Sequence, residues 1–97
     1  MTKSKTRAFD AANYLDTEED IAEYLRQVLV DNDPIELAAA LGDIARARGM
    51  SKLAADTGLS RESLYKSLSG EHAPSSDTLF KVIRALGFEI SLTPKSA

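Results

Sequence analysis

Residues 51–70, SKLAADTGLSRESLYKSLSG, contain the pattern that decides the fold of this chain. They predict a short helix over Lys52–Thr57, a turn at Gly58–Leu59 and a second helix over Arg61–Leu68. The glycine of this turn is the residue type that adopts the left-handed conformation at the end of a helix. The hydroxyl of Ser60 can cap the helix that follows. The stretch therefore predicts a helix-turn-helix.

The second of these helices has one apolar and one polar face. Leu64 and Leu68 lie four residues apart, on the same face, and we expect them to enter the core. The opposite face suits base edges and phosphates, and it comprises Arg61, Glu62, Ser63, Tyr65, Lys66 and Ser69. Ser51 and Lys52 begin the preceding helix, whose N-terminus favours anions, so we expect them to hold phosphates. The alternative is a helical hairpin with a polar outer face.

The composition bounds the class of protein. Ninety-seven residues make one domain with a modest core, and 43% hydrophobic and 28% charged residues are ordinary for a globular chain. The absence of cysteine excludes a disulfide scaffold and thiol-based metal sites. No apolar run approaches the length of a membrane helix, and the basic N-terminus lacks the apolar segment of a secretory signal. We expect a cytoplasmic protein.

Motifs that would indicate catalysis are lacking. The sequence has no Gly-rich phosphate loop, no metal-ligand cluster and no Ser/His/Asp order that closes a triad. His72, the one histidine, falls in a predicted loop over residues 70–74 without a second ligand or a nucleophile beside it. We expect no enzymatic activity, no cofactor and no metal.

The net charge of −3 is unevenly distributed. Residues 8–44 hold ten acidic residues against the single base Arg26, whereas residues 45–97 hold eight bases against five acids. Such an asymmetry can mark separate partners for the two halves. The alternative is a solvated acidic face.

Two amphipathic helices are predicted before residue 51. The first begins at Thr17, whose hydroxyl can cap it, and carries acids in its first turn and an apolar stripe at three-and-four spacing. Asp33 and Pro34 suit the cap and first position of the second helix, which extends to about Arg48. Arg46 and the arginine at position 48 either interact with the end of this helix or contact phosphates.

The chain closes with one more helix and a predicted strand. Ser75 or Ser76 caps a helix over Asp77–Leu86, with core side chains from Leu79, Phe80, Val82, Ile83 and Leu86. Residues 88–93 then alternate apolar and polar side chains, as a half-buried strand does. An unpaired strand leaves its backbone groups open. Pairing with a second copy would make Phe88, Ile90 and Leu92 a homodimer contact, and the alternative is packing on the domain's own helices.

Together these elements predict an all-α bundle of about five helices with a short C-terminal β-strand. We divide the chain into a flexible N-terminal arm, residues 1–16, and a helix-turn-helix domain, residues 17–97. Phe9, Tyr14 and Leu15 are apolar residues at the end of this arm that could anchor it to the domain or to a partner.

The stretch LAADTGLSRESLYKSLSG resembles the λ-repressor-like (Xre/Cro) helix-turn-helix family. With the flanking segments DIARARGMSK and PSSDTLFKVIRALG, the chain is similar, from about Tyr14 to Leu92, to the probable addiction-module antidote family of HigA-type antitoxins. The resemblance implies a λ-repressor-like bundle with an extra N-terminal helix. It also implies a nucleoid-associated autorepressor that binds operator DNA and neutralises a RelE/HigB-like toxin, a small basic ribonuclease.

The acidic segment is the surface that would suit such a toxin, because carboxylates can replace RNA phosphates on a basic protein. The acids concentrated there are Asp10, Asp16, Glu18, Glu19, Asp20 and Glu23, and the arm residues Phe9, Tyr14 and Leu15 could add apolar anchors. Two other functions remain open at this point. One is a prophage-type repressor without a toxin, and the other is a protein-interaction module that no longer binds DNA.

Overall fold

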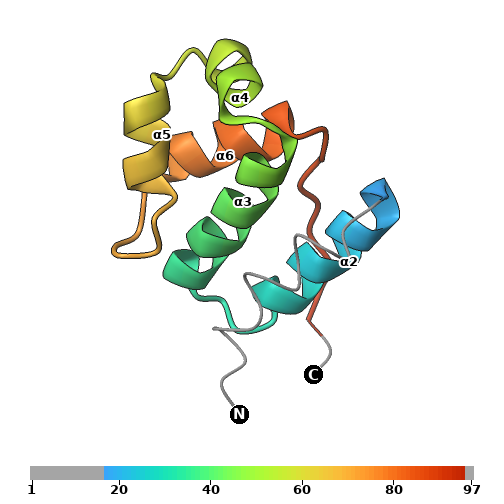
Figure 1. The fold of residues 1–97 in the computed structure, drawn as a ribbon. Helices are drawn as coiled ribbons and strands as arrows, with labels where there is room; N and C mark the ends of the chain where they lie inside the picture. The colour runs from blue at the N-terminus through green and yellow to red at the C-terminus, as the bar shows by residue number, and fades with distance from the viewer. Residues whose placement is uncertain (1–16, 96–97) are drawn as a thin grey trace.

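The computed structural model describes residues 17–95, and the chain there forms five α-helices and no strand (Figure 1). The predicted all-α bundle is confirmed in this respect. The helices are α2 (Glu18–Leu29), α3 (Pro34–Arg48), α4 (Met50–Thr57), α5 (Arg61–Ser67) and α6 (Ser76–Ala85).

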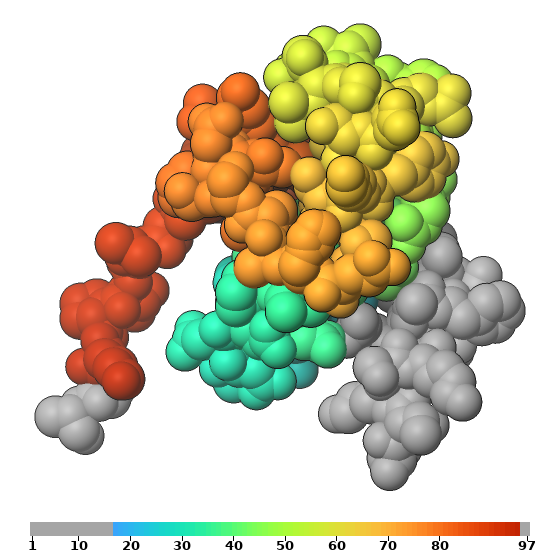
Figure 2. All heavy atoms as spheres, turned by 90° about the vertical axis from the view of Figure 1, so that its left-hand side faces the viewer, coloured from blue at the N-terminus to red at the C-terminus, as the bar shows by residue number. Residues whose placement is uncertain are grey.

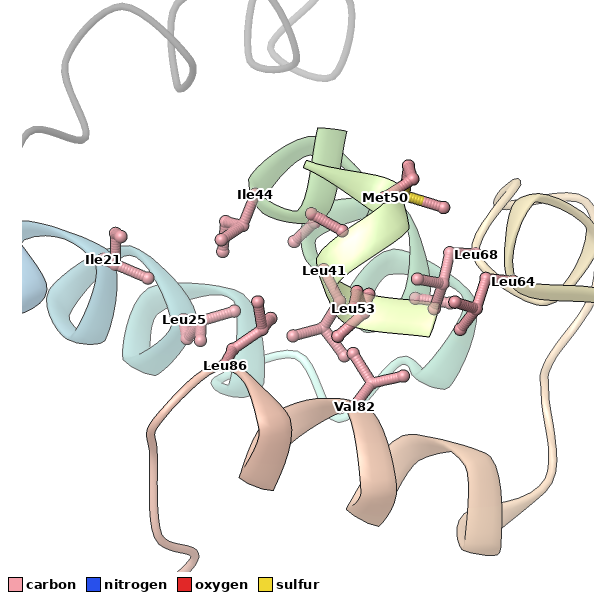
Figure 3. Close-up of a cluster of buried hydrophobic side chains, with 13 residues drawn as sticks. Ile21, Leu25, Leu41, Ile44, Met50, Leu53, Leu64, Leu68, Val82 and Leu86 are labelled. Carbon is pink, nitrogen blue, oxygen red and sulfur yellow. The ribbon is translucent and has the colours of Figure 1, made fainter. Parts of the chain in front are cut away.

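Helix α3 is the central element of the bundle. In Figure 1, α2 lies on one side of it and the α4–α5 pair on the other, while α6 crosses beside α3. The apolar side chains of all five helices meet in one core, where those of Leu41, Leu64 and Val82 have no exposed surface (Figure 3). This core fixes the positions of α2 and α5 on different sides of the molecule.

Four helices begin at the capping residues that the sequence predicts. The side-chain oxygens of Thr17, Asp33, Ser60 and Ser75 accept hydrogen bonds from backbone N–H groups two or three residues further on. Gly58 ends α4 in the left-handed conformation, with φ of 78°. These signals are local, so they need no knowledge of the tertiary structure.

The predicted boundaries of three helices differ from the structure by one or two residues, and the smallest difference is in α5, which ends at Ser67 and not at Leu68. Helix α4 begins at Met50, two residues before the predicted start, and its N-cap residue is Gly49, which provides no side-chain cap. Helix α6 spans Ser76–Ala85, one residue earlier at each end than predicted. Met50 is buried, and this burial draws the first turn of α4 towards the core.

The predicted strand over residues 88–93 is wrong for the single chain. Between residues 17 and 95 the chain has no strand, and residues 88–95 run as a segment without regular secondary structure that is extended in Figure 1. A strand needs the backbone of another extended segment beside it, and the other described residues are helices and short connections. Phe88 packs against the core, but Ile90 is 53% exposed and Leu92 is 95% exposed.

Phe80 is not a core residue, contrary to the sequence-based expectation. Its side chain is 50% exposed, whereas Val82 and Leu86 are buried and Leu79 and Ile83 are half-buried. At about 100° per residue, Phe80 lies some 160° away from Val82 around the helix. The hydrophobic character of Phe80 predicts a core position, but its place on the helix turns the side chain to the surface.

Gly42 permits a close contact between α3 and the end of α5 that the sequence analysis missed. A Cβ atom at this position would lie 2.5 Å from the carbonyl oxygen of Leu68 and 3.2 Å from the Leu68 Cβ. Both atoms belong to a residue that is 1% exposed. Only glycine leaves space for α5 to end against α3 in this way.

Candidate functional site

The eight residues predicted to contact DNA are all exposed. Arg61, Glu62, Ser63, Tyr65 and Lys66 lie on α5, Ser69 follows it, and Ser51 and Lys52 lie in the first turn of α4. Leu64 has no exposed surface, so the predicted division of α5 into an inward and an outward face is present. We call the outward residues Arg61, Glu62, Ser63, Tyr65 and Lys66 the α5 face.

The two basic residues of the α5 face are available to an anionic partner. Within residues 17–95, neither Arg61 nor Lys66 forms an ion pair. In contrast, the Lys52 ammonium on α4 lies 3.0 Å from the Asp56 carboxylate, and its side chain is 77% exposed. An exposed pair of this kind is weak and can exchange for a phosphate.

Two of the serine residues help to form α5 itself. The backbone N–H of Ser63 donates to the Ser60 hydroxyl at 3.0 Å, which closes the first turn. The Ser69 hydroxyl donates to the Lys66 carbonyl at 3.0 Å and accepts from the Glu71 N–H at 3.2 Å. Ser69 therefore closes the end of α5, a structural role that the sequence analysis did not assign.

The acidic residues on α2 lie on its exposed surface, and the structure gives three of them internal partners. Glu18 lies 3.0 Å from Arg48, while Glu19 and Glu23 lie 4.0 Å and 3.1 Å from Arg26. Hydrogen bonds from Gln27 and then Arg26 lower the pKa of Glu23, which keeps this carboxylate ionised. The acidic surface of α2 remains net negative, because one arginine faces Glu19 and Glu23 together.

Five of the residues proposed for toxin contact in the acidic segment lie outside the described residues. They are Phe9, Asp10, Tyr14, Leu15 and Asp16.

Arg46 and Arg48 are both engaged within the domain. The Arg46 guanidinium lies 2.9 Å from the carboxylate of Asp43, a buried residue on the same helix. The Arg48 guanidinium donates to the Leu86 carbonyl at 3.2 Å and to Glu18, so it joins the ends of α2, α3 and α6. These contacts favour the structural interpretation of the two arginines over phosphate binding.

No group of three His, Cys, Asp or Glu side chains in residues 17–95 could hold a metal ion. None of the described helices combines the length and apolar character needed to cross a membrane.

The fold and these surfaces define a small all-α protein that presents charged side chains outward on α2 and α5. Over residues 5–94, the chain matches the family described as "Probable addiction module antidote protein", and it belongs to this family. It is also 46% identical over 84 residues to a Haemophilus influenzae protein named "Uncharacterized protein", and the match covers 87% of each chain. No solved structure matches the chain.

Proposed function

We propose that the protein is the antitoxin of a type II toxin–antitoxin module, which represses its own operon and neutralises a RelE/HigB-like toxin. Membership of the antidote family is the observation that carries this proposal. The protein acts by binding and not by catalysis, and the HigA-type and λ-repressor-like assignments belong to the same proposal.

Operator binding is assigned to the α4–α5 pair as a helix-turn-helix. The α5 face would enter the major groove, where Arg61 and Lys66 are suited to guanine and phosphate acceptors. Ser51 and Lys52, at the start of α4, would contact the phosphate backbone. This role is supported by the predicted end of α4 at Gly58 and the predicted cap of α5 at Ser60. Arg61 and Lys66 are also exposed, and neither forms an ion pair within residues 17–95.

Toxin binding is assigned to the acidic surface of α2, together with the apolar residues of the N-terminal arm. A basic ribonuclease surface meets RNA phosphates, and a row of carboxylates can satisfy the same charges. In Figure 1, α2 and α5 lie on opposite sides of α3. This separation supports the assignment of the two partners to two surfaces.

Operator binding by a homodimer completes the proposal. One short recognition helix reads only a few base pairs, and two copies on half-sites about one helical turn apart multiply the affinity. Phe88, Ile90 and Leu92 remain the proposed dimer contact, although no strand forms in the single chain. The exposure of Ile90 and Leu92 supports this role.

Reversing two charges on α2 tests the proposed toxin site. Because Glu18 holds Arg48, the variant Glu19→Lys/Glu23→Lys changes the acidic surface while leaving this interhelical contact in place. We expect its affinity for the product of the adjacent gene, measured by calorimetry, to fall at least about tenfold, because like charges then face each other. The matched control Glu71→Lys/Asp77→Lys makes the same charge change outside α2 and should bind as the native chain does.

An equal loss in test and control variants would mean that only the net charge matters, and unchanged affinity in both would move the toxin site away from α2. A companion variant, Phe9→Ala/Tyr14→Ala/Leu15→Ala, tests the arm separately. If the adjacent gene product does not bind the native chain at all while operator DNA does, the protein is a repressor without a toxin.

A further inference from the structure

An apolar groove lies between α6 and the extended segment that follows it. It has a volume of about 410 Å³ and is lined by Phe80, Ile83, Arg84, Phe88, Glu89 and Ile90. Figure 2 shows the segment, in red, running along the edge of the molecule away from α5. We call this surface the α6 groove.

Large apolar side chains are exposed in the α6 groove and next to it in the sequence. Phe80 is 50% exposed, Ile90 is 53% exposed, and the neighbouring Leu92 is 95% exposed. Large apolar side chains gathered on one face mark an interaction site, whereas single ones scattered over a surface do not.

The backbone beside the groove is also open to pairing. The Phe88 N–H donates to the Ile83 carbonyl at 3.2 Å, which holds the start of the segment against α6. Among the described residues, the backbone groups of residues 89–95 form no hydrogen bond with another backbone group. An extended segment in this state can accept a second extended chain.

The charges of the groove favour a second copy of the chain as its occupant. Arg84 and Glu89 carry opposite charges and both line the groove, so the surface as a whole is neutral and complementary to its own copy. In an interface with two-fold symmetry, each residue of the patch contacts the same patch on the partner. A strongly basic toxin or a DNA phosphate backbone would instead require a groove of one charge.

We propose that the α6 groove is the interface of a two-fold symmetric homodimer, in which Arg84 of each copy faces Glu89 of the other and Leu92 becomes buried. This inference deepens the homodimer of the proposed function and rests on it. It adds α6 and an ion pair to a contact that was assigned to the C-terminal segment alone. In both Figure 1 and Figure 2 the segment lies away from α5, so the dimer leaves the α5 face open.

The test exchanges the two charges one at a time and together. The native chain is expected at twice its 10.5 kDa mass in sedimentation equilibrium at micromolar concentration. In Arg84→Glu, two glutamates face each other across the interface, and in Glu89→Arg two arginines do. We expect the dimer dissociation constant of each variant to rise at least about tenfold, because each interface then contains two like-charged pairs.

Mixing the two variants gives the distinguishing result. The heterodimer of Arg84→Glu with Glu89→Arg pairs a glutamate with an arginine at both contacts, so the mixture should dimerise more tightly than either variant does alone. The double variant Arg84→Glu/Glu89→Arg should also dimerise. Arg61→Glu, which makes the same charge change on α5, is the control and should remain dimeric, and circular dichroism melting curves check that each variant is folded.

Each other outcome contradicts the inference in a specific way. If the native chain is dimeric and the single variants remain dimeric, the interface lies elsewhere while the proposed dimer stands. A native chain that is monomeric at micromolar concentration rejects both the groove interface and the dimer, and leaves DNA and toxin binding to their own tests. A monomeric chain in which Phe80→Asp weakens binding of the adjacent gene product would place the toxin in the groove.

Discussion

The double variant Arg61→Ala/Lys66→Ala is expected to lose at least about 30-fold in affinity for duplex DNA taken from upstream of its own gene. Each side chain contributes about 1–3 kcal/mol if it contacts a base edge, and each 1.4 kcal/mol is tenfold. The two residues are exposed on α5 and form no ion pair within residues 17–95, so their removal leaves no charged partner unpaired there.

A matched control separates base contacts from net charge. The variant Arg26→Ala/Lys95→Ala removes the same two charges from α2 and from the C-terminal segment, which Figure 1 places away from α5. Fluorescence anisotropy titrations with the upstream duplex and a scrambled duplex, at two salt concentrations, measure both variants. Equal losses in the two variants, or equal losses on the two duplexes, would contradict base contacts by the α5 face.

Gly42→Ala is expected to lower the free energy of unfolding by about 1–3 kcal/mol, although alanine is the better helix former. The new methyl group would lie 2.5 Å from the Leu68 carbonyl oxygen, and this backbone atom can move only if the end of α5 moves away from α3. For a domain of this size, each kcal/mol corresponds to roughly 4–8 °C in Tm.

The sign of the change in unfolding free energy distinguishes the effect of the close contact from the effect of helix propensity. Without the close approach, Gly42→Ala would stabilise the protein by about 1 kcal/mol through helix propensity. The control is Ala47→Gly, at an exposed position on the same helix, which should destabilise the protein by about 1 kcal/mol through helix propensity alone. Urea unfolding curves of the two variants measure the difference, and a stabilised Gly42→Ala variant would contradict the contact between α3 and Leu68.

The parts of the structure that the sequence predicted well depend on local signals. Thr17, Asp33 and Ser60 cap helices because their side chains bond backbone groups within three residues. Leu64 and Leu68 are buried as their spacing predicts, because a four-residue interval places both on one face of a helix. The same periodicity exposes Arg61 and Lys66.

The parts that it missed depend on contacts between distant residues. Nothing local distinguishes Gly42 from an alanine, since its role comes from Leu68, twenty-six residues further along the chain. Arg48 bonds to Glu18 and to the Leu86 carbonyl, and these two partners are likewise brought to it by the packing of the helices. Alternation over residues 88–93 predicted a strand, but a strand also needs a neighbour, which the single chain does not provide.

In the proposed function, one chain binds toxin on α2 and operator DNA on α5, with α3 between them. The most direct measurement is native mass spectrometry of the full chain mixed with the adjacent gene product and the upstream duplex. We predict one species that contains all three components, with the same amount of DNA bound as in the absence of the toxin. If the toxin instead displaces the DNA, so that only the two binary complexes occur, both partners bind the α5 face and the account of two surfaces is wrong.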